Sequence, residues 1–419
     1  MWYLARMLRL LFIFFIFLLI MLPPGQQVQA FDLGTERLRV SGFGTLGLTW
    51  GGKKNYGIQK EYTHDFQYGN VSVLTDSVFG LQLDFNITKH LDATIQAVAE
   101  DRIRQDFNNI VDWAYLSYRP TSNLVIRAGR MGIDLFMLSE YRNVGYAYLW
   151  THPVIEFYKP ISLSHYEGID FRYSRRIKPG YFEFKVFGGQ TGSDINVGNG
   201  EFNLRMRPFV GFNTSLEDND WKIRLTYSTT DTAFIKAPAD PLVNALNLVP
   251  QALWPQAAAL HDRLKGVDTQ THYFSAGFSY DKHNWIIQSE FSLIASRWAS
   301  VDMTNGYLSV GRRIGPVTLY TVGSYARSSS RPRVDQNQIL SADLRDLAFA
   351  TQNLLDAVHI DQNTVSVGLR WDFYPRTALK LQWDHTWTRK HGGGLLDLKK
   401  PLDHDITLNM FSANLNFVF

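Results

Sequence analysis

The amino-acid sequence predicts an all-β fold, a transmembrane antiparallel β-barrel of about sixteen strands. Three observations support this prediction. Apolar and polar residues alternate over stretches of about ten residues. Short turns and long polar connections follow one another along the chain. The final stretch alternates in the same way and ends in an aromatic residue.

The alternation is clearest over residues 78–100. Its apolar positions are large side chains that stand two residues apart, namely Leu81, Leu83, Phe85 and Ile87. After the turn at 88–90 the same spacing continues with smaller apolar residues. Because successive side chains of a strand point to opposite faces, each strand has one apolar and one polar face. The polar face must meet water.

Short turns rich in Pro, Gly, Asn and Asp join pairs of strands. They lie near 88–90, 119–123, 178–180, 217–220, 281–284, 313–316 and 374–377. Longer connections separate the hairpins, at 51–76, 131–168, 188–205, 229–270, 328–361 and 389–404. The seven short turns join strands two to fifteen, and a first strand at 38–50 and a last one bring the total to about sixteen. We expect the short turns at the periplasmic rim and the long loops outside the cell.

The last strand, 407–419, must pair with the first, because lipid offers no hydrogen-bond partner to a free strand edge. A soluble β-sandwich is the alternative. Its exposed face would not carry so many large aromatics near strand ends, where the interfacial girdles of membrane barrels lie. Those aromatics are Trp221, Tyr227, Trp285, Trp371, Phe373 and Trp383.

Residues 1–30 have the pattern of an export signal. Arg6 and Arg9 precede an apolar run, and small residues end the segment at Ala30. A transmembrane anchor would need roughly 20 apolar residues, and this run is shorter. We therefore predict cleavage after Ala30, a barrel over 31–419 and a place in the bacterial outer membrane.

Composition excludes several classes of function. Cleavage would remove two arginines and no acid, so the net charge would fall from +3 to +1 (3 − 2), which gives no support for nucleic-acid binding. The absence of cysteine excludes disulfides and thiolate metal sites. Asp384 and His385 are neighbours in a strand and should point to opposite faces. A cation site at Asp403 and Asp405 is less plausible than a solvated charge run. We predict no enzyme activity, no cofactor and no metal site.

The most specific local pattern lies in the second quarter of the chain. It consists of AYLSYRP at 114–120, LVIRAGR at 124–130 and SEYRNVGYAY at 139–148, followed by Pro153 and Glu156. With this pattern and its terminal strand, the chain resembles the Gram-negative outer-membrane porins of the sixteen-stranded diffusion class. The resemblance implies passive diffusion of small hydrophilic solutes and ions, contact with outer-membrane lipid, and a possible homotrimer. The terminal Phe419 resembles the signal read by the outer-membrane assembly machinery.

In the resembled family the third loop, which joins strands five and six, folds into the lumen, and by strand count this is the connection 131–168 here. Loop carboxylates then oppose wall arginines, and the resulting field orients dipolar solutes. The constriction residues implied in this way are Arg39, Arg127, Arg130, Asp134, Glu140 and Arg172. Arg130 is expected at the loop base, and Glu156 elsewhere in the loop. Charges that merely solubilise the mouth are the alternative.

Further charges are predicted to face inward because they lie opposite the apolar face of their strands. The basic ones besides those above are Arg119, Lys185, Lys222, Arg224, Arg370 and Lys380. The acidic ones are Asp84, Asp92, Glu100, Asp170, Glu183, Glu290, Asp372 and Asp384. The two signs nearly cancel, so the sequence does not decide ion selectivity.

Two loops contain helical apolar spacing, at 242–264 and 339–358. Helices there could cap the mouth and make the channel substrate-specific or suited to export, or they could only pack on neighbouring loops. A barrel enzyme or adhesin is the third class of function left open.

Overall fold

The computed structural model describes residues 37–104, 106–197, 200–235, 237–267, 269–298, 302–398 and 402–419. The predicted signal peptide, 1–30, and its cleavage site after Ala30 lie outside these residues. Within the described part of the chain, no helix is both long and apolar enough to cross a membrane.

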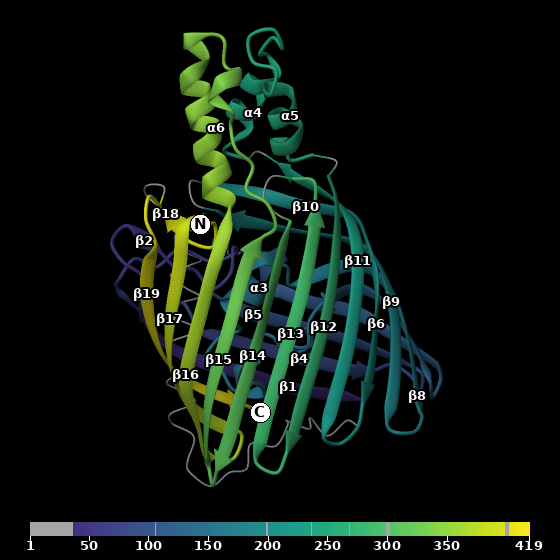
Figure 1. The fold of residues 1–419 in the computed structure, drawn as a ribbon. Coiled ribbons are helices and arrows are strands. Elements are labelled where there is room, and N and C mark those ends of the chain that lie inside the picture. Colours follow the sequence, from purple (N-terminus) through teal and green to yellow (C-terminus); the bar gives the residue numbers. More distant parts are fainter. Residues whose placement is uncertain are drawn as a thin grey trace.

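The described residues form a closed antiparallel barrel of sixteen long strands, so the predicted fold class is confirmed (Figure 1). The strands are β1 (Leu38–Gly51), β4 (Val78–Asn86), β5 (Leu91–Glu100), β6 (Val111–Thr121), β7 (Leu124–Gly132), β8 (His165–Arg176), β9 (Tyr181–Asn196), β10 (Glu201–Glu217), β11 (Trp221–Ile235), β12 (Thr269–Lys282), β13 (Trp285–Ser296), β14 (Met303–Ile314), β15 (Val317–Ser328), β16 (Ile360–Tyr374), β17 (Thr377–Gly393) and β19 (Ile406–Val418). Each pairs with its neighbours in the chain, and pairing of β1 with both β4 and β19 closes the ring.

Three short strands lie at the loop rim. They are β2 (Tyr56–Gly57), β3 (Val71–Ser72) and β18 (Asp397–Leu398). Strand β3 pairs with the end of β1, and β2 pairs with β18. These pairings fold the loops that follow β1 and β17 toward each other.

The two faces of the barrel wall differ as the alternation predicts. Leu81, Leu83 and Phe85 of β4 are exposed on the outside, whereas Gln82 of the same strand bonds to Gln96 of β5 on the inside. Across the barrel the exposed apolar side chains form an outer belt, which includes the rings of Trp285, Trp371, Phe373 and Trp383. Since lipid accepts apolar surface and an aqueous lumen accepts polar groups, this is the surface of a membrane-spanning barrel.

The C-terminus completes the closure at the short-turn rim. Phe419 exchanges two backbone hydrogen bonds with Gly42 of β1, of 3.0 and 2.9 Å. Its ring lies over Gly42 and beside the ring of Phe79, with centroids 6.4 Å apart. A side chain at Gly42 would collide with this ring, so the first strand must be small here for the last residue to pack.

One predicted loop is wrong in extent. The connection expected at 188–205 is mostly strand, because β9 runs to Asn196 and β10 begins at Glu201. Gly189 lies opposite Gly168 where β8 and β9 approach closely. A Cβ atom on Gly189 would stand 2.1 Å from the Glu167 carbonyl oxygen. The glycines therefore serve the pairing of two strands.

Helices occur in the long loops, as predicted. The α-helices are α2 (Phe107–Ile110), α3 (Ile155–Tyr158), α4 (Asp240–Asn247), α5 (Ala257–Leu264) and α6 (Arg345–Val358), and the 3-10 turns are η1 (Gly145–Ala147), η2 (Lys159–Ile161), η3 (Gln336–Gln338) and η4 (Ala342–Leu344). The segment 242–264 is divided between α4 and α5, with Pro250 and Pro255 between them.

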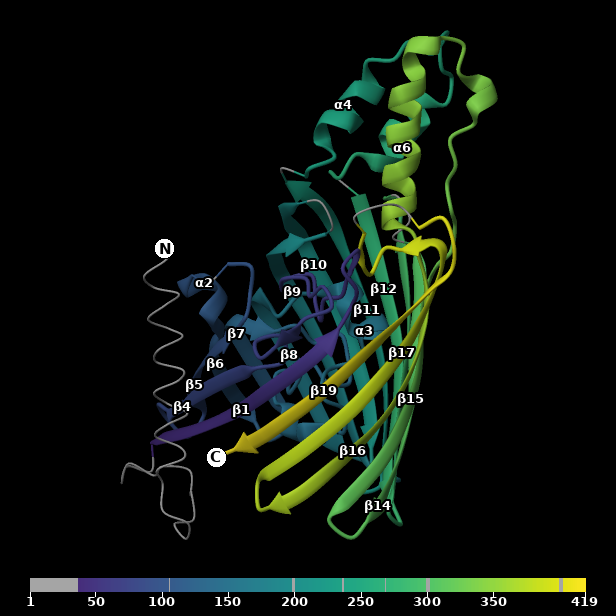
Figure 2. The same cartoon turned by 90° about the vertical axis from the view of Figure 1, so that its left-hand side faces the viewer.

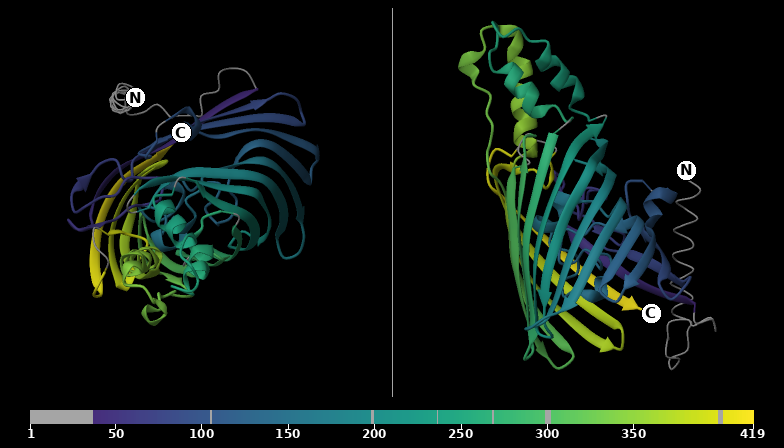
Figure 3. Two further views of the ribbon diagram at one scale, coloured as in Figure 1. Left: turned by 90° about the horizontal axis from the view of Figure 1, so that it is seen from above. Right: turned by 90° about the vertical axis from the view of Figure 1, so that its right-hand side faces the viewer.

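Helices α4, α5 and α6 stand above the loop rim and pack on one another (Figure 2). Their shared core contains Leu246, Trp254, Leu260 and Leu355. Seen from above, they lie within the outline of the barrel (Figure 3). These helices therefore pack on one another, and they lie over part of the mouth.

Candidate functional site

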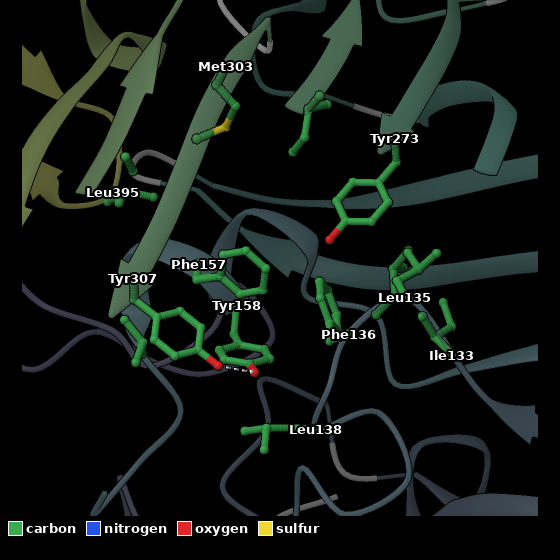
Figure 4. Close-up of a cluster of buried hydrophobic side chains, with 14 of the residues drawn as sticks. Ile133, Leu135, Phe136, Leu138, Phe157, Tyr158, Tyr273, Met303, Tyr307 and Leu395 are labelled. Atoms are coloured by element: carbon green, nitrogen blue, oxygen red, sulfur yellow. Dashed lines mark hydrogen bonds between the residues drawn. The ribbon is translucent and has the colours of Figure 1, made fainter. Parts of the chain in front are cut away.

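The connection between β7 and β8, residues 133–164, folds into the barrel, and we call it the lumen loop. Its apolar side chains are withdrawn from solvent: Leu138 is 0% exposed, and Trp150, Phe157 and Tyr158 are each 1% exposed. They pack against inward-facing Tyr273 and Tyr307 of the wall (Figure 4). A loop at the surface would leave such side chains in water, so this burial requires the wall around it.

The start of the lumen loop meets a basic wall. Asp134 accepts hydrogen bonds from Lys185 at 2.8 Å, from Asn213 at 3.1 Å and from Arg224. These three residues belong to β9, β10 and β11. Further along the loop, Glu140 pairs with Arg172 of β8. Loop carboxylates thus face basic side chains across the lumen.

A second carboxylate, Asp170 of β8, joins the same group. It lies 2.8 Å from Arg127 and 3.4 Å from Lys185. We call the set Arg127, Arg172, Lys185, Arg224, Asp134, Glu140, Asp170 and Glu183 the ionic cluster; Glu183 is included because it lies 3.8 Å from Arg172. Four basic and four acidic residues leave the cluster without net charge.

Four of the six predicted constriction residues belong to this cluster: Arg127, Asp134, Glu140 and Arg172. Arg39 lies elsewhere, near the short-turn rim, where its side chain is 71% exposed and 3.1 Å from Asp84. Whether these residues set permeation stays a prediction.

The placement of Arg130 is corrected by the structure. Arg130 stands three positions after Arg127, which puts it on the opposite face of β7. There it pairs with Glu167 at 2.6 Å and donates to backbone oxygens of 108 and 111. It braces the neighbouring connection on the outside, away from the lumen loop.

The middle of the lumen loop is held by basic side chains that bond to its backbone. Lys380 of β17 donates to the carbonyl oxygens of Gly145, Tyr148 and Trp150, the last at 2.8 Å. Arg370 of β16 donates to the Tyr146 oxygen at 2.7 Å. The loop carbonyls have no regular secondary structure to pair with, so the wall supplies their donors.

The remaining side is held by two buried acids. Glu290 of β13 accepts from the Met137 backbone N–H at 2.8 Å and from the hydroxyls of Tyr158 and Tyr307. Glu156 of the loop accepts from Gln362 at 2.7 Å and Ser324 at 2.8 Å. The lumen loop is therefore bonded to wall strands on several sides.

A second charged group lies between the lumen loop and loop 52–77. Arg142 pairs with Glu61 at 2.9 Å, and Glu100 lies 2.7 Å from Arg102 and 3.2 Å from His64. Burial raises the pKa of the Glu61 carboxyl, but the charges of Arg142, His64 and Lys60 together outweigh burial and lower that pKa below its usual value. Two small cavities of about 30 and 10 Å³ border these side chains.

Sequence reasoning predicted that Lys185, Arg224, Lys380 and Glu290 face inward, from strand parity. It did not predict that each would bond to the lumen loop, since parity gives a face and no partner. Arg142 and Glu61 were missed, because loop residues have no periodic pattern from which to infer their direction.

The adjacent acid and histidine of β17 lie on different faces of the wall. Asp384 faces the lumen, 3.4 Å from His152, whereas His385 bonds to Asn409 and is half-buried. The predicted separation of these neighbours is confirmed. Among the residues that the structure describes, no three His, Asp or Glu side chains gather in a way that could hold a metal ion.

Comparisons with known proteins relate this geometry to solved structures. No family model matches the chain, and no curated protein sequence matches it. OmpF of Salmonella typhi, solved with daunomycin, superposes with a TM-score of 0.52 and 9% identity, covering 91% of this chain and 97% of its own. An anion-selective porin from Comamonas acidovorans superposes with a TM-score of 0.51 and 10% identity, covering 91% of this chain and 100% of its own.

The chain has the fold of the outer-membrane porins. OmpT of Vibrio cholerae, an outer-membrane protein, superposes with a TM-score of 0.50 at 10% identity, covering 92% of this chain and 99% of its own. At such low identity the likeness concerns the porin fold, while the side chains described above belong to this chain alone.

Proposed function

We propose that this protein is a porin, a channel for passive diffusion of small hydrophilic solutes and ions across the bacterial outer membrane. The observation that carries the proposal is the lumen loop. It enters a closed, lipid-compatible barrel and sets Asp134 and Glu140 against basic side chains of β8, β9 and β11. Opposed charges in a narrow lumen favour polar solutes that can exchange hydration for them.

The route that fits such solutes runs past the charged side of the lumen loop. The ionic cluster lies on one part of this side, and the group around Glu61, Glu100 and Arg142 on another. The small cavity of about 30 Å³ is lined by residues of both groups, including Glu140, Arg142 and Glu100. Because the charges of the ionic cluster balance, we expect weak selectivity between anions and cations.

Single-channel conductance in a planar bilayer tests the proposal. Purified, folded protein should insert and give current steps whose size increases with salt concentration. Liposomes containing it should swell in solutions of small sugars. A matched preparation from cells that lack the protein controls for contaminating channels. Folded protein that inserts but gives neither current nor swelling would contradict the proposal.

A substrate-specific channel is the second candidate, and helices α4, α5 and α6 over part of the mouth favour it. Competition distinguishes the two. A general porin should show current that is insensitive to millimolar sugars, phosphate or dicarboxylates, whereas a specific channel should be blocked by one of them.

Location and assembly complete the proposal. We propose export by a signal peptide cleaved after Ala30, insertion by the outer-membrane assembly machinery through the strand that ends at Phe419, and a homotrimer in the membrane. N-terminal sequencing of the mature protein and its native mass in detergent would test the first and last of these.

A further inference from the structure

A larger cavity than the two described above lies in the lumen, on the side of the lumen loop that faces the helices. Its volume is about 160 Å³, and we call it the apolar chamber. Leu135 and Ile161 of the lumen loop border it, as do Val358 at the end of α6 and Trp298 after β13. Inward-facing residues of β9 to β14 form its wall, among them Ile195, Leu204, Phe209, Tyr273, Ile294 and Met303.

The chemistry of the apolar chamber is opposite to that of the ionic cluster. Its lining contains no Asp, Glu, Lys, Arg or His side chain. Apart from the Trp298 indole N–H, its polar side chains carry hydroxyls, and three of these bond in a row: Thr232 to Thr271 and Thr271 to Ser296, each at 3.1 Å. A barrel lumen filled with water should be lined by polar residues, so this stretch of wall is built for other contents.

The side chains that line the chamber are partly exposed at its outer end and buried at its inner end. Phe202, Phe234 and Trp298 at the outer end are half-buried and form a row of rings, with centroids 5.5 and 4.4 Å apart. Phe209 and Met303 deeper inside are each 2% exposed. Aromatic faces at the opening lead to an apolar interior.

We propose that the apolar chamber binds compact, uncharged solutes of about the size of one aromatic ring. A cavity of roughly 150 Å³ lined by apolar side chains binds benzene, and this chamber is of that size. A charged analogue would lose its hydration without gaining a partner, which is costly in an apolar site. The inference rests on the proposed channel function, because the lumen is the route by which the solute arrives.

The test compares two neighbouring residues of β13. Ile294 points into the chamber and is 4% exposed, whereas Leu293 points to the lipid and is 40% exposed. Ile294→Trp fills the chamber, and Leu293→Trp adds the same bulk outside. Fluorine NMR of protein in lipid nanodiscs measures binding of 4-fluorophenol, with 4-fluorobenzoate as the charged probe. Lipid partitioning is common to all variants.

We expect Ile294→Trp to weaken 4-fluorophenol binding at least tenfold and Leu293→Trp to change it less than twofold. In the unaltered protein, 4-fluorobenzoate should bind at least tenfold more weakly than 4-fluorophenol. Equal binding of the two probes, or equal binding by the two Trp variants, would overturn the proposal.

A second variant covers the case in which Ile294→Trp does not fold. Ile294→Ala enlarges the chamber and should improve binding of a fluoronaphthol severalfold relative to the unaltered protein, and no improvement would count against the chamber. Binding without any conductance would contradict the channel and leave the chamber standing. Conductance without binding would contradict the chamber and leave the channel standing.

Discussion

The hold of the ionic cluster on the lumen loop can be measured by replacing Asp134 with asparagine. This substitution keeps the shape of the side chain but removes the negative charge that Lys185 and Arg224 share. Breaking a buried ion pair by neutralising one partner costs about 3–5 kcal/mol. Here Lys185 keeps Asp170 at 3.4 Å and Arg224 keeps the Asp134 backbone oxygen at 2.9 Å. We therefore expect the lower end, about 3 kcal/mol.

The assay uses the absence of cysteine from the chain. Ser275 of β12 is 4% exposed and donates to the Leu135 carbonyl at 3.0 Å, so it is covered by the lumen loop. In a Ser275→Cys background the introduced thiol is unique, and a maleimide reaches it only when the loop lifts. Since each 1.36 kcal/mol is a tenfold change in an equilibrium, about 3 kcal/mol predicts labelling somewhat over a hundredfold faster.

The control is Asp281→Asn in the same background. Asp281 pairs with Arg313 at the short-turn rim, where both side chains are largely exposed, and such a pair contributes about 0–1 kcal/mol. Labelling should then change less than fivefold. If Asp134→Asn accelerated labelling no more than this control, the ionic cluster would not be what holds the loop start.

Three further predictions concern charge, pH and assembly. In Glu140→Gln, Arg172 keeps Glu183 at 3.8 Å as its acidic partner. Because Glu140 is exposed, loss of its charge should raise the anion-to-cation permeability ratio only about twofold, measured from the reversal potential. Asp281→Asn should leave this ratio unchanged. Burial lowers the pKa of His152, but its hydrogen bond and charge contact with Asp384 outweigh this and raise the pKa to about 9. The contact between His152 and Asp384 therefore contributes its full stability to the folded protein below about pH 6.5, and this contribution is lost as pH rises through 9. In Asp384→Asn, the pKa of His152 measured by NMR should fall below 6.5. Phe419→Ser should reduce the assembled barrel in membranes severalfold, whereas Phe411→Ser, which removes a lipid-facing ring from the same strand, should reduce it less.

Strand number and closure could be predicted from the sequence, because alternation and turn chemistry are local properties. The face of Lys185 or Glu290 follows from parity for the same reason. The extent of β9 and β10 could not, since glycines such as Gly189 look alike in a loop and in a tightly paired strand. The entry of the lumen loop was implied only by the family resemblance. The prediction that Arg130 lines the constriction was wrong, because the resemblance implies a position along the chain and no face, and a separation of three residues puts Arg130 on the opposite face from Arg127.

The contacts of the lumen loop coincide with a second sequence feature, namely large apolar residues at strand positions that face inward. In β12 to β15 the inward positions include Tyr273, Ile294, Met303, Tyr307 and Tyr320, where a water-filled lumen would favour small polar residues. Each of these side chains packs against the lumen loop or borders the apolar chamber. Apolar residues on the wet face therefore mark where protein or an apolar solute replaces water. Beside the charged inward positions of β7 to β9, they divide the lumen into two chemically distinct sides.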